Sequence, residues 1–321
     1  MSPVPAPGNR LTVAVVGLGG IGGIAAGCLA HDGRHTVVAC ARRPLDRLTV
    51  ELPEGTIDVA LNALTDPGEA APVDWVLLCT KAHETASAGP WLERLWRPST
   101  HVAVMQKGIE HAARIAPWTG GATAVPVVVN YNGEKLGPGR VRLRHVADYD
   151  MTVADNAPGR AVAELLAGTP LRVLASADFT TAAWRKLLIN VVANPINALT
   201  LQRQAVFLRE DIYALGLAVA EEAVAVGRAD GTKFAADEAT QAMARLLTIA
   251  PELGSSMYFD RLAGRPLEIE VLTGAVVAAG QRHGIATPLN GALLTMLRAV
   301  NDAAMAEHKA QPKRDGGLPA A

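Results

Sequence analysis

The sequence predicts an α/β domain with a mostly parallel sheet, followed by an all-α C-terminal domain. Strand-like apolar runs alternate with helical patterns through the first half of the chain, and such alternation builds parallel sheets through right-handed crossovers. From residue 179 onward the patterns are helical. The length of 321 residues, half of them hydrophobic, fits two domains with sizeable cores.

The predicted strands of the first domain are short apolar runs rich in β-branched residues. They cover residues 11–16, 35–40, 57–60, 74–79, 101–105 and 123–129, with a last strand near 171–175. Two further strands, at 140–146 and 149–154, are expected as antiparallel additions at the sheet edge. The clearest helices between strands are 20–31 and 84–96.

Helical patterns of the second domain cover residues 180–194, 205–229, 235–250, 266–283 and 287–306. Gly231 and Gly284 follow the second and fourth of these as helix stops, because glycine readily takes the left-handed conformation that ends a helix. The domain boundary is placed near Asp178. The predicted domains are therefore 11–178 and 179–306, between a disordered N-terminus at 1–10 and a disordered tail at 307–321.

The charge balance narrows the class of partner. Thirty Lys and Arg face 31 Asp and Glu, a net charge of −1, which argues against nucleic acid and against anionic membranes. The apolar runs are too short or too interrupted to span a membrane, and the first ten residues contain no signal-peptide core. The sequence therefore predicts a cytoplasmic protein.

Cysteine and histidine spacing predicts neither a disulfide framework nor a metal site. Cys28, Cys40 and Cys79 lie far apart within apolar patterns, which is typical of inert buried thiols in a reducing compartment. The eight histidines form no set with ligand spacing, so we expect no metal.

A glycine motif closes the first predicted strand. The β-branched run at 12–16 stops at Gly17-x-Gly19-x-x-Gly22. The first glycine makes the tight turn, the second lets the backbone approach a pyrophosphate, and the third lets the next helix pack on the sheet. The strand before the motif and the helix after it are the context of a Rossmann-type dinucleotide site. The predicted cofactor loop also includes Leu18, Gly20 and Ile21. A glycine-rich turn in another kind of α/β protein is the alternative.

The end of the second strand distinguishes NAD from NADP. An acidic residue there binds the ribose 2′-hydroxyl, whereas an arginine accommodates a 2′-phosphate. This chain has Arg42 and Arg43, and no carboxylate until Asp46. A guanidinium can hold a phosphate through two charge-assisted hydrogen bonds, so NADP(H) is favoured. The alternative is that both arginines are solvated loop residues.

Lys81 follows the strand at 74–79, where a lysine can reach the ribose or the nicotinamide end of a bound cofactor. A surface lysine at a strand end is the alternative interpretation.

A polar row marks the first helix of the second domain. Asp178 or a threonine can cap its start. Lys186, Asn190 and Asn194 are then spaced at i, i+4 and i+8, so they share one face of an otherwise apolar helix. Buried polar groups need partners, which favours a ligand-facing row; a helix edge that meets water is the alternative. Pro195 disfavours helical geometry at Asn194, so the helix is expected to bend or end there.

A second polar constellation follows. Ser255-Ser256-Met257 precedes a helical turn, and Leu267-Glu268-Ile269-Glu270 is expected to open the next long helix. Glu268 and Glu270 are two residues apart and point to different faces, so one can enter a cleft while the other stays solvated. Carboxylates in a first turn also suit the helix dipole, which is the structural alternative for both.

These residues resemble the ketopantoate reductase (2-dehydropantoate 2-reductase) family through nearly all of residues 11–303. Two stretches are fairly specific to it: Trp184-Arg-Lys-Leu-Leu-Ile-Asn190 with Asn194-Pro195, and Ser255-Ser256-Met257 with Glu268. The other matching segments are Gly17–Gly22, Thr80-Lys81-Ala82, Asp260 and His283-Gly284-Ile285. The resemblance implies a Rossmann domain, a helical domain, and an active site in the cleft between them.

The resemblance also implies an activity and a role for each site residue. The family uses NADPH to reduce the 2-keto group of ketopantoate to pantoate, a step toward pantothenate and coenzyme A. By resemblance, Lys186 is the general acid, and Glu268 helps to hold the substrate and that lysine. The implied substrate hydrogen-bonding residues are Asn190, Asn194 and Ser256. Lys81 is implied to bridge cofactor and substrate, and Arg42 to bind the 2′-phosphate.

One departure leaves the substrate open. The family usually has Asn-Gly after the strand that ends here at Met105, whereas this chain has Lys107-Gly108. A second ammonium in the pocket would lower the pKa of Lys186 and could recruit a different anionic substrate. Alternatively, Lys107 points to solvent and only the turn at Gly108 matters.

The sequence is therefore compatible with three functions: a ketopantoate reductase, a related NADPH-dependent reductase of another keto acid or an imine, and a non-catalytic NADP(H) sensor. A homodimer through the helical domain is a further possibility, because an apolar helical face can form an interface.

Overall fold

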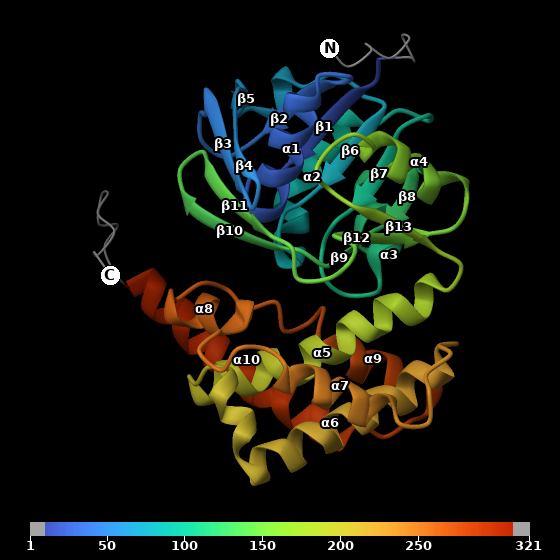
Figure 1. The fold of residues 1–321 in the computed structure, drawn as a ribbon, viewed down its shortest axis with the longest axis vertical. Helices are drawn as coiled ribbons and strands as arrows, with labels where there is room; N and C mark the ends of the chain where they lie inside the picture. The colour runs from blue at the N-terminus through green and yellow to red at the C-terminus, as the bar shows by residue number, and fades with distance from the viewer. Residues whose placement is uncertain (1–9, 311–321) are drawn as a thin grey trace. The chain divides into compact units, whose positions relative to one another are not determined.

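The computed structural model describes residues 10–310, with side chains described through Ala306. The chain forms two compact units that divide between Ala183 and Trp184, inside one long helix (Figure 1). The predicted boundary near Asp178 lies just before this helix, whereas the units divide one turn into it. The termini predicted to be disordered lie outside the described residues, except for residue 10 and the helical backbone at 307–310.

The first unit is built on a six-stranded parallel sheet in the order β5-β2-β1-β6-β7-β8. Its strands are β1 (Thr12–Val16), β2 (Thr36–Cys40), β5 (Ala63–Leu64), β6 (Trp75–Leu78), β7 (His101–Val104) and β8 (Thr123–Pro126). The predicted parallel sheet is confirmed. Because β2 and β6 both flank β1, the carboxyl ends of these three strands lie side by side at one edge.

Both faces of this sheet are buried. Alternate residues of β1 belong to two apolar clusters, Val13 to one and Ala14 to the other. The first cluster includes α1 (Gly20–Asp32), and the second includes α2 (Thr85–Leu95) and α3 (His111–Ile115). This double burial explains why the strands are continuous apolar runs in the sequence.

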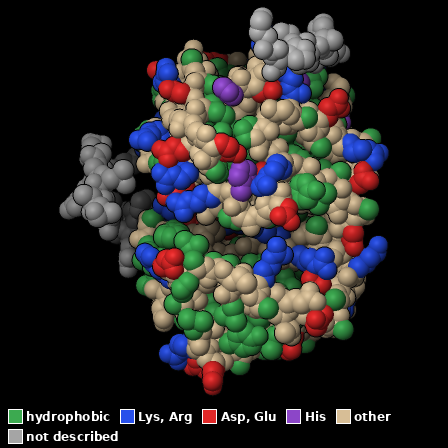
Figure 2. All heavy atoms as spheres, viewed as in Figure 1, with side chains coloured by type: hydrophobic (Ala, Val, Ile, Leu, Met, Phe, Trp, Pro, Cys, Tyr) green, Lys and Arg blue, Asp and Glu red, His purple; other side chains and the backbone are tan. Residues whose placement is uncertain are grey.

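A separate four-stranded sheet, in the order β10-β11-β3-β4, packs on α1. Its strands are β3 (Arg47–Leu52), β4 (Gly55–Ala60), β10 (Asn132–Gly137) and β11 (Arg140–Arg144). The close approach depends on Gly23 of α1, because a Cβ there would lie 2.9 Å from Cγ1 of Val141. On the outer face of the sheet, Glu51 forms ion pairs with Arg140 and Arg142. Figure 2 shows acidic and basic side chains interleaved on the surface of the molecule.

The prediction that 140–146 is an antiparallel addition to the main sheet is wrong. β11 pairs antiparallel with β10 and parallel with β3, in the second sheet. The predicted strand at 57–60 also lies there, as β4. Neither β3 nor β10 was predicted, and without them the second layer could not be recognised.

A three-stranded sheet, in the order β13-β12-β9, completes the unit. Its elements are β9 (Val128–Val129), β12 (Met151–Ala154) and β13 (Val173–Ser176), with α4 (Ala157–Leu166) between the last two strands. The predicted strand at 123–129 is therefore divided between two sheets, directly after Pro126, which has no N–H to donate. The segment at 149–154 is antiparallel to β9, as expected, but it is parallel to β13 and lies outside the main sheet.

Every regular element in the described part of the second unit is a helix, as predicted. Its elements are α5 (Phe179–Thr200, begun in the first unit), η4 (Gln204–Leu208), α6 (Glu210–Ala229), α7 (Glu238–Leu247), α8 (Ser256–Leu262), α9 (Thr273–His283) and α10 (Pro288–Ala310). Gly284 ends α9 with φ +67°, and Gly231 lies just beyond α6 with φ +92°, which confirms both predicted stops. None of the helices in the described part of the chain is long and apolar enough to cross a membrane.

Several helix ends differ from the prediction, among them the start of α6, at Glu210 rather than at 205. The helix α5 continues through Pro195 to Thr200, because residues 191–198 are all buried and their packing outweighs the lost backbone hydrogen bond. The helix α9 begins at Thr273 rather than at 266, since the N–H of Leu267 donates instead to Oδ1 of Asn301 on α10 (2.9 Å). Glu268 and Glu270 therefore lie in the turn before α9.

Candidate functional site

The glycine motif turns sharply at the carboxyl end of β1. Gly17 has φ +95°, and its N–H donates to the carbonyl of Cys40 at the end of β2 (3.0 Å). At Gly22, an added Cβ would clash with the carbonyl oxygen of Gly17 and would lie 2.7 Å from Cβ of Cys79. These two glycines hold the turn against the sheet.

The motif is open at Gly19. Gly19 is the N-cap of α1 and makes no side-chain cap, and a Cβ at this position would have no atom within 4 Å. The first turn of α1 contains no acidic residue. The start of α1 therefore combines a helix end without a side-chain cap, the positive end of the helix dipole and open space at Gly19, which is an arrangement suited to a phosphate.

The remaining loop residues anchor this turn. Leu18 and Ile21 are partly buried against the apolar core, and the carbonyl of Ile21 accepts a hydrogen bond from the Tyr131 hydroxyl (3.0 Å). Burial raises the pKa of Tyr131, so this phenol stays a donor. Gly20 packs against the backbone of Gly133, with room for no side chain.

Arg42 and Arg43, at the end of β2, are both exposed. The Arg42 side chain is 89% exposed, and its Nη1 donates to Oε1 of Glu84 (3.1 Å) in η2 (Ala82–Glu84). Arg42 thus has an ion-pair partner that sequence analysis missed. The overlooked signal is an acidic residue three positions after Lys81, in the turn that follows the neighbouring strand β6.

Lys81 and Lys107 follow β6 and β7 and are both half-buried. Between these strand ends lies Gln106, a buried residue whose Nε2 donates to Oγ1 of Thr80 (3.0 Å). Gly108 follows with φ +95°. Gln106 therefore fixes the backbone on which both lysines are carried, and it too was missed, although a polar residue directly after a buried strand is a usable signal.

His111 binds the backbone of the same turn, at Gln106. It is 2% exposed, and its Nε2 lies 2.9 Å from the carbonyl of Gln106. Burial lowers the pKa of His111 to about 4, so the ring is neutral at physiological pH and donates through Nε2–H.

The three cysteines cannot serve as nucleophiles near neutral pH. Burial raises the pKa values of Cys28, Cys40 and Cys79 to about 12 each, which keeps the thiols protonated. Within residues 10–306, no cluster of three or more His, Cys, Asp or Glu could hold a metal ion.

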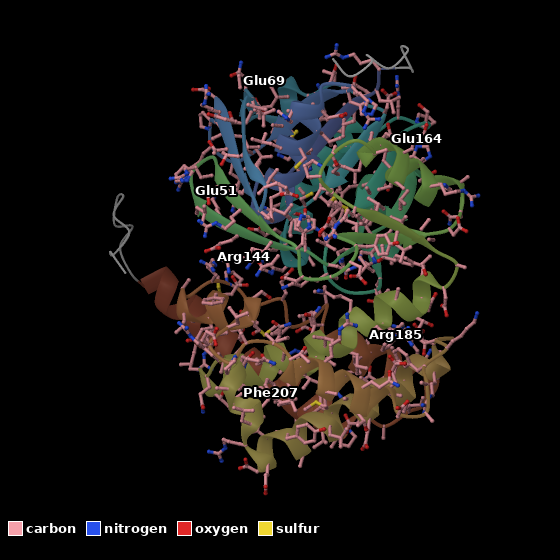
Figure 3. All side chains as sticks on the ribbon, in the orientation of Figure 1. Glu51, Glu69, Arg144, Glu164, Arg185 and Phe207 are labelled. Atoms are coloured by element: carbon pink, nitrogen blue, oxygen red, sulfur yellow. The ribbon has the colours of Figure 1, made fainter. Side chains whose placement is uncertain are left out.

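In the second unit, α5 carries the predicted polar row. Oδ1 of Asp178 accepts the N–H of Thr181 (3.2 Å), which confirms the predicted cap. Lys186 is half-buried and lies one turn before Asn190. Its neighbour Arg185, labelled in Figure 3, forms two hydrogen bonds with the buried Glu238 of α7 (2.6 and 3.0 Å). This pair fixes the turn of α5 that presents Lys186.

Hydrogen bonds link the row to α8. Nδ2 of Asn194 donates to Oδ1 of Asn190 (3.1 Å). Oδ1 of Asn194 in turn accepts from Oγ of Ser256 and from the N–H of Met257, both at 3.3 Å. Three of the predicted substrate-binding residues therefore form one continuous chain of donors and acceptors.

Glu268 and Glu270 differ in their exposure to solvent, as predicted. Glu268 is buried, with 6% of its surface exposed, whereas Glu270 forms two 2.7 Å hydrogen bonds with Arg298 on the surface of α10. Glu268 is therefore the carboxylate kept from bulk water, and Glu270 has a structural partner.

Comparison with known proteins places the chain in a family. The family model described as "Ketopantoate reductase PanE/ApbA" matches residues 13–157, and its C-terminal counterpart matches residues 178–301. The chain is 38% identical over 291 residues to the 2-dehydropantoate 2-reductase of Caulobacter vibrioides, which covers 90% of this chain and 98% of that protein. The chain belongs to the ketopantoate reductase family.

Other members support the same conclusion. The 2-dehydropantoate 2-reductase of Mycobacterium tuberculosis is 37% identical over 295 residues, with 90% of this chain and 98% of that protein covered. The crystal structure of the PanE/ApbA family ketopantoate reductase of Ralstonia eutropha JMP134 superposes with a TM-score of 0.82 at 30% identity, over 92% of this chain and 99% of that one. The dimeric ketopantoate reductase of Staphylococcus aureus gives a TM-score of 0.81 at 25% identity, over 92% and 100%.

This ketopantoate reductase family member is therefore an oxidoreductase with a dinucleotide-binding unit and a helical unit. The two matched segments contain every candidate site residue, from Gly17 to Gly108 in one and from Lys186 to Glu268 in the other.

Proposed function

We propose that this chain catalyses the NADPH-dependent reduction of the 2-keto group of 2-dehydropantoate to pantoate. The observation that carries the proposal is the hydrogen-bonded row Asn190–Asn194–Ser256, which lies next to Lys186 in a chain that belongs to the ketopantoate reductase family. Such a row offers neutral donors and acceptors to a small polar acid, and the lysine offers a proton.

The first unit fits a dinucleotide carrying a 2′-phosphate. The open backbone at Gly19 and the uncapped start of α1 suit the pyrophosphate, and the exposed guanidinium of Arg42 suits the 2′-phosphate, with Arg43 beside it. Lys81, Lys107 and Gly108 lie on the turns after β6 and β7, at the edge where cofactors bind parallel sheets. When bound there, NADPH supplies the hydride.

Lys186 acts as the general acid in this proposal. Reduction of a ketone places negative charge on its oxygen, and an ammonium within hydrogen-bonding distance stabilises that charge and delivers the proton that completes the alcohol. The Arg185–Glu238 pair holds the backbone from which Lys186 extends. Glu268 helps to orient the lysine and the substrate.

The amide row binds the substrate. Asn190, Asn194 and Ser256 can donate to a carboxylate or accept from a hydroxyl without adding net charge. Because their hydrogen bonds to one another already fix their side chains, little conformational entropy is lost when substrate binds.

The direct test is a steady-state assay. We expect ketopantoate-dependent oxidation of NADPH, and slower oxidation of NADH at equal concentration. Absence of turnover with ketopantoate, in protein that binds NADPH, would overturn the proposed substrate; absence of any turnover across a panel of 2-keto acids and imines would favour a nucleotide sensor instead.

A second substrate class is favoured by one observation. Lys107 is half-buried at the turn after β7, where the family usually has asparagine. An additional ammonium there can attract a keto acid with a second anionic group. Assays with ketopantoate and with 2-keto diacids, in the wild type and in Lys107→Asn, distinguish the two: a diacid reductase loses diacid turnover in the variant, whereas a ketopantoate reductase keeps its activity.

We further infer a cytoplasmic homodimer. The Staphylococcus aureus relative is described as dimeric, and the helical unit here exposes large apolar side chains, with Leu208 70% exposed and Phe259 45% exposed. Apolar side chains are also visible on the helical unit in Figure 2. Free thiols at Cys28, Cys40 and Cys79 fit a reducing compartment. Light scattering of the purified protein tests the dimer, and fluorescent tagging tests the location.

A further inference from the structure

An ion pair spans the glycine turn. Arg42 follows β2, and Glu84 ends η2, the turn after β6. Their side chains meet at 3.1 Å. Because β2 and β6 are the two neighbours of β1, a bond between residues that follow them crosses the carboxyl end of β1, where the turn at Gly17 begins. The pair therefore lies over the strand end that leads into the candidate phosphate loop.

The two partners are held very differently. Glu84 belongs to a short, well-anchored turn: its N–H donates to the carbonyl of Lys81 (2.9 Å), and Oγ1 of Thr85 donates to the carbonyl of Ala82 (2.7 Å). Arg42 follows β2 in an exposed segment. The Glu84 side chain is also the better covered of the two. The carboxylate is therefore the fixed member, and the guanidinium is the member that can turn toward a ligand.

We propose that Glu84 determines nucleotide specificity by competing with the 2′-phosphate of NADPH for Arg42. This inference rests on the proposed function, in which Arg42 binds that phosphate. The guanidinium must turn some of its N–H groups away from Glu84 to bind the phosphate through two hydrogen bonds, so the carboxylate and the phosphate compete for the same donors. NADH has no 2′-phosphate, so its binding does not meet this competition.

The competition is strong enough to measure and too weak to abolish NADPH binding. An exposed ion pair between flexible side chains contributes little, so the doubly charged phosphate displaces the carboxylate. The remaining competition lowers the preference for NADPH over NADH by about two- to fivefold.

The experiment measures dissociation constants of NADPH and NADH for the full-length protein by fluorescence titration. The variants are Glu84→Gln, Arg42→Ala and the double variant. Glu93→Gln is the matched control, because it also removes one negative charge. Glu93 lies near the C-terminal end of α2, where the carbonyl of Leu95 accepts the N–H of Val73, just before β6 begins. The control charge therefore lies at the opposite edge of the sheet from Glu84.

We expect Glu84→Gln to tighten NADPH binding about two- to fivefold, with NADH changed by less than about twofold. In the Arg42→Ala background the same substitution is expected to have less than about twofold effect on either nucleotide, because the residue through which Glu84 acts is gone. Glu93→Gln is expected to bind both nucleotides as the wild type does.

Three results would overturn the inference. Equal tightening of NADPH and NADH in Glu84→Gln would mean that Glu84 acts on the shared part of the nucleotides. A gain for NADPH that persists without Arg42 would mean direct repulsion rather than competition. If Glu84→Gln changes the affinity for neither nucleotide while Arg42→Ala still weakens NADPH binding selectively, Glu84 has no role in specificity but Arg42 keeps its role. If Arg42→Ala weakens the binding of both nucleotides equally, the proposed contact between Arg42 and the 2′-phosphate is wrong as well.

Discussion

Asn194 accepts a hydrogen bond from Ser256, with 3.3 Å between Oδ1 and Oγ. The two residues are 62 positions apart in the chain, on α5 and α8. Asn194 is only 2% exposed and also accepts the N–H of Met257 (3.3 Å). One amide therefore joins the two sequence stretches that are fairly specific to the family, and it orders the start of α8 at the same time.

Replacing Asn194 by alanine is expected to affect both stability and substrate binding. The buried N–H of Met257 would lose an acceptor, at a cost of about 1–3 kcal/mol in the free energy of unfolding. The KM for ketopantoate should rise about tenfold or more, because Asn190 and Ser256 lose the residue that aligns them. Urea denaturation and steady-state kinetics measure the two effects. Asn62→Ala, at an exposed position, should change neither; unchanged KM in Asn194→Ala would remove the row from the substrate site.

Much of the fold was predictable because local pattern and tertiary environment agree. Strands buried on both faces, such as β1 and β6, appear as continuous apolar runs, and Gly284 ends α9 where a left-handed residue is needed. The candidate residues on α5 were predictable for a similar reason: spacing at i, i+4 and i+8 on a helix fixes a common face.

What failed depends on contacts distant in sequence. The second sheet can pack on α1 because Gly23 has no side chain, which leaves space for Val141. The sequence pattern of neither segment alone indicates this contact. The helix α5 survives Pro195 because its surroundings are buried. Glu84 was invisible as a partner of Arg42 for the same reason, since 42 residues separate them.

Lys186→Ala is expected to reduce kcat for ketopantoate reduction by about two orders of magnitude or more, because no other ammonium is proposed to protonate the oxygen. The dissociation constant for NADPH should change by less than about twofold, since nucleotide binding is assigned to the first unit. Lys233→Ala is the control, an exposed lysine of the same helical unit. An unchanged kcat in Lys186→Ala would eliminate the proposed acid.

Gly19→Ala and Gly22→Ala should fail in different ways. A Cβ at Gly19 meets no atom within 4 Å, so the variant should fold with nearly wild-type stability yet bind NADPH at least about tenfold more weakly, because the methyl group occupies the space proposed for the pyrophosphate. A Cβ at Gly22 strikes the Gly17 carbonyl and lies 2.7 Å from Cβ of Cys79, so that variant should lose about 1–3 kcal/mol of stability. Thermal melts with nucleotide titration separate the two; strong NADPH binding by Gly19→Ala would contradict the proposed loop.

His111 predicts an acid-dependent loss of stability. Burial lowers the pKa of this ring from 6.5 to about 4 in the folded protein, while the unfolded chain keeps the ordinary value. Between these two pH values the unfolded state binds more protons, so the contribution is fully present above pH 6.5 and declines as the pH falls toward 4. Each pKa unit corresponds to about 1.4 kcal/mol, so the total loss is about 3 kcal/mol.

His111→Gln keeps an N–H donor for the Gln106 carbonyl but cannot titrate, so its stability should fall less steeply over the same pH range. Urea denaturation of the wild type and the variant at pH 7, 5.5 and 4 gives the comparison. His31→Gln, at an exposed position in the last turn of α1, should retain the wild-type slope. If the free energies of unfolding of the wild type and His111→Gln fall equally with pH, the buried ring does not govern the acid sensitivity. The turn that carries Lys107 and Gly108 then tolerates a protonated His111.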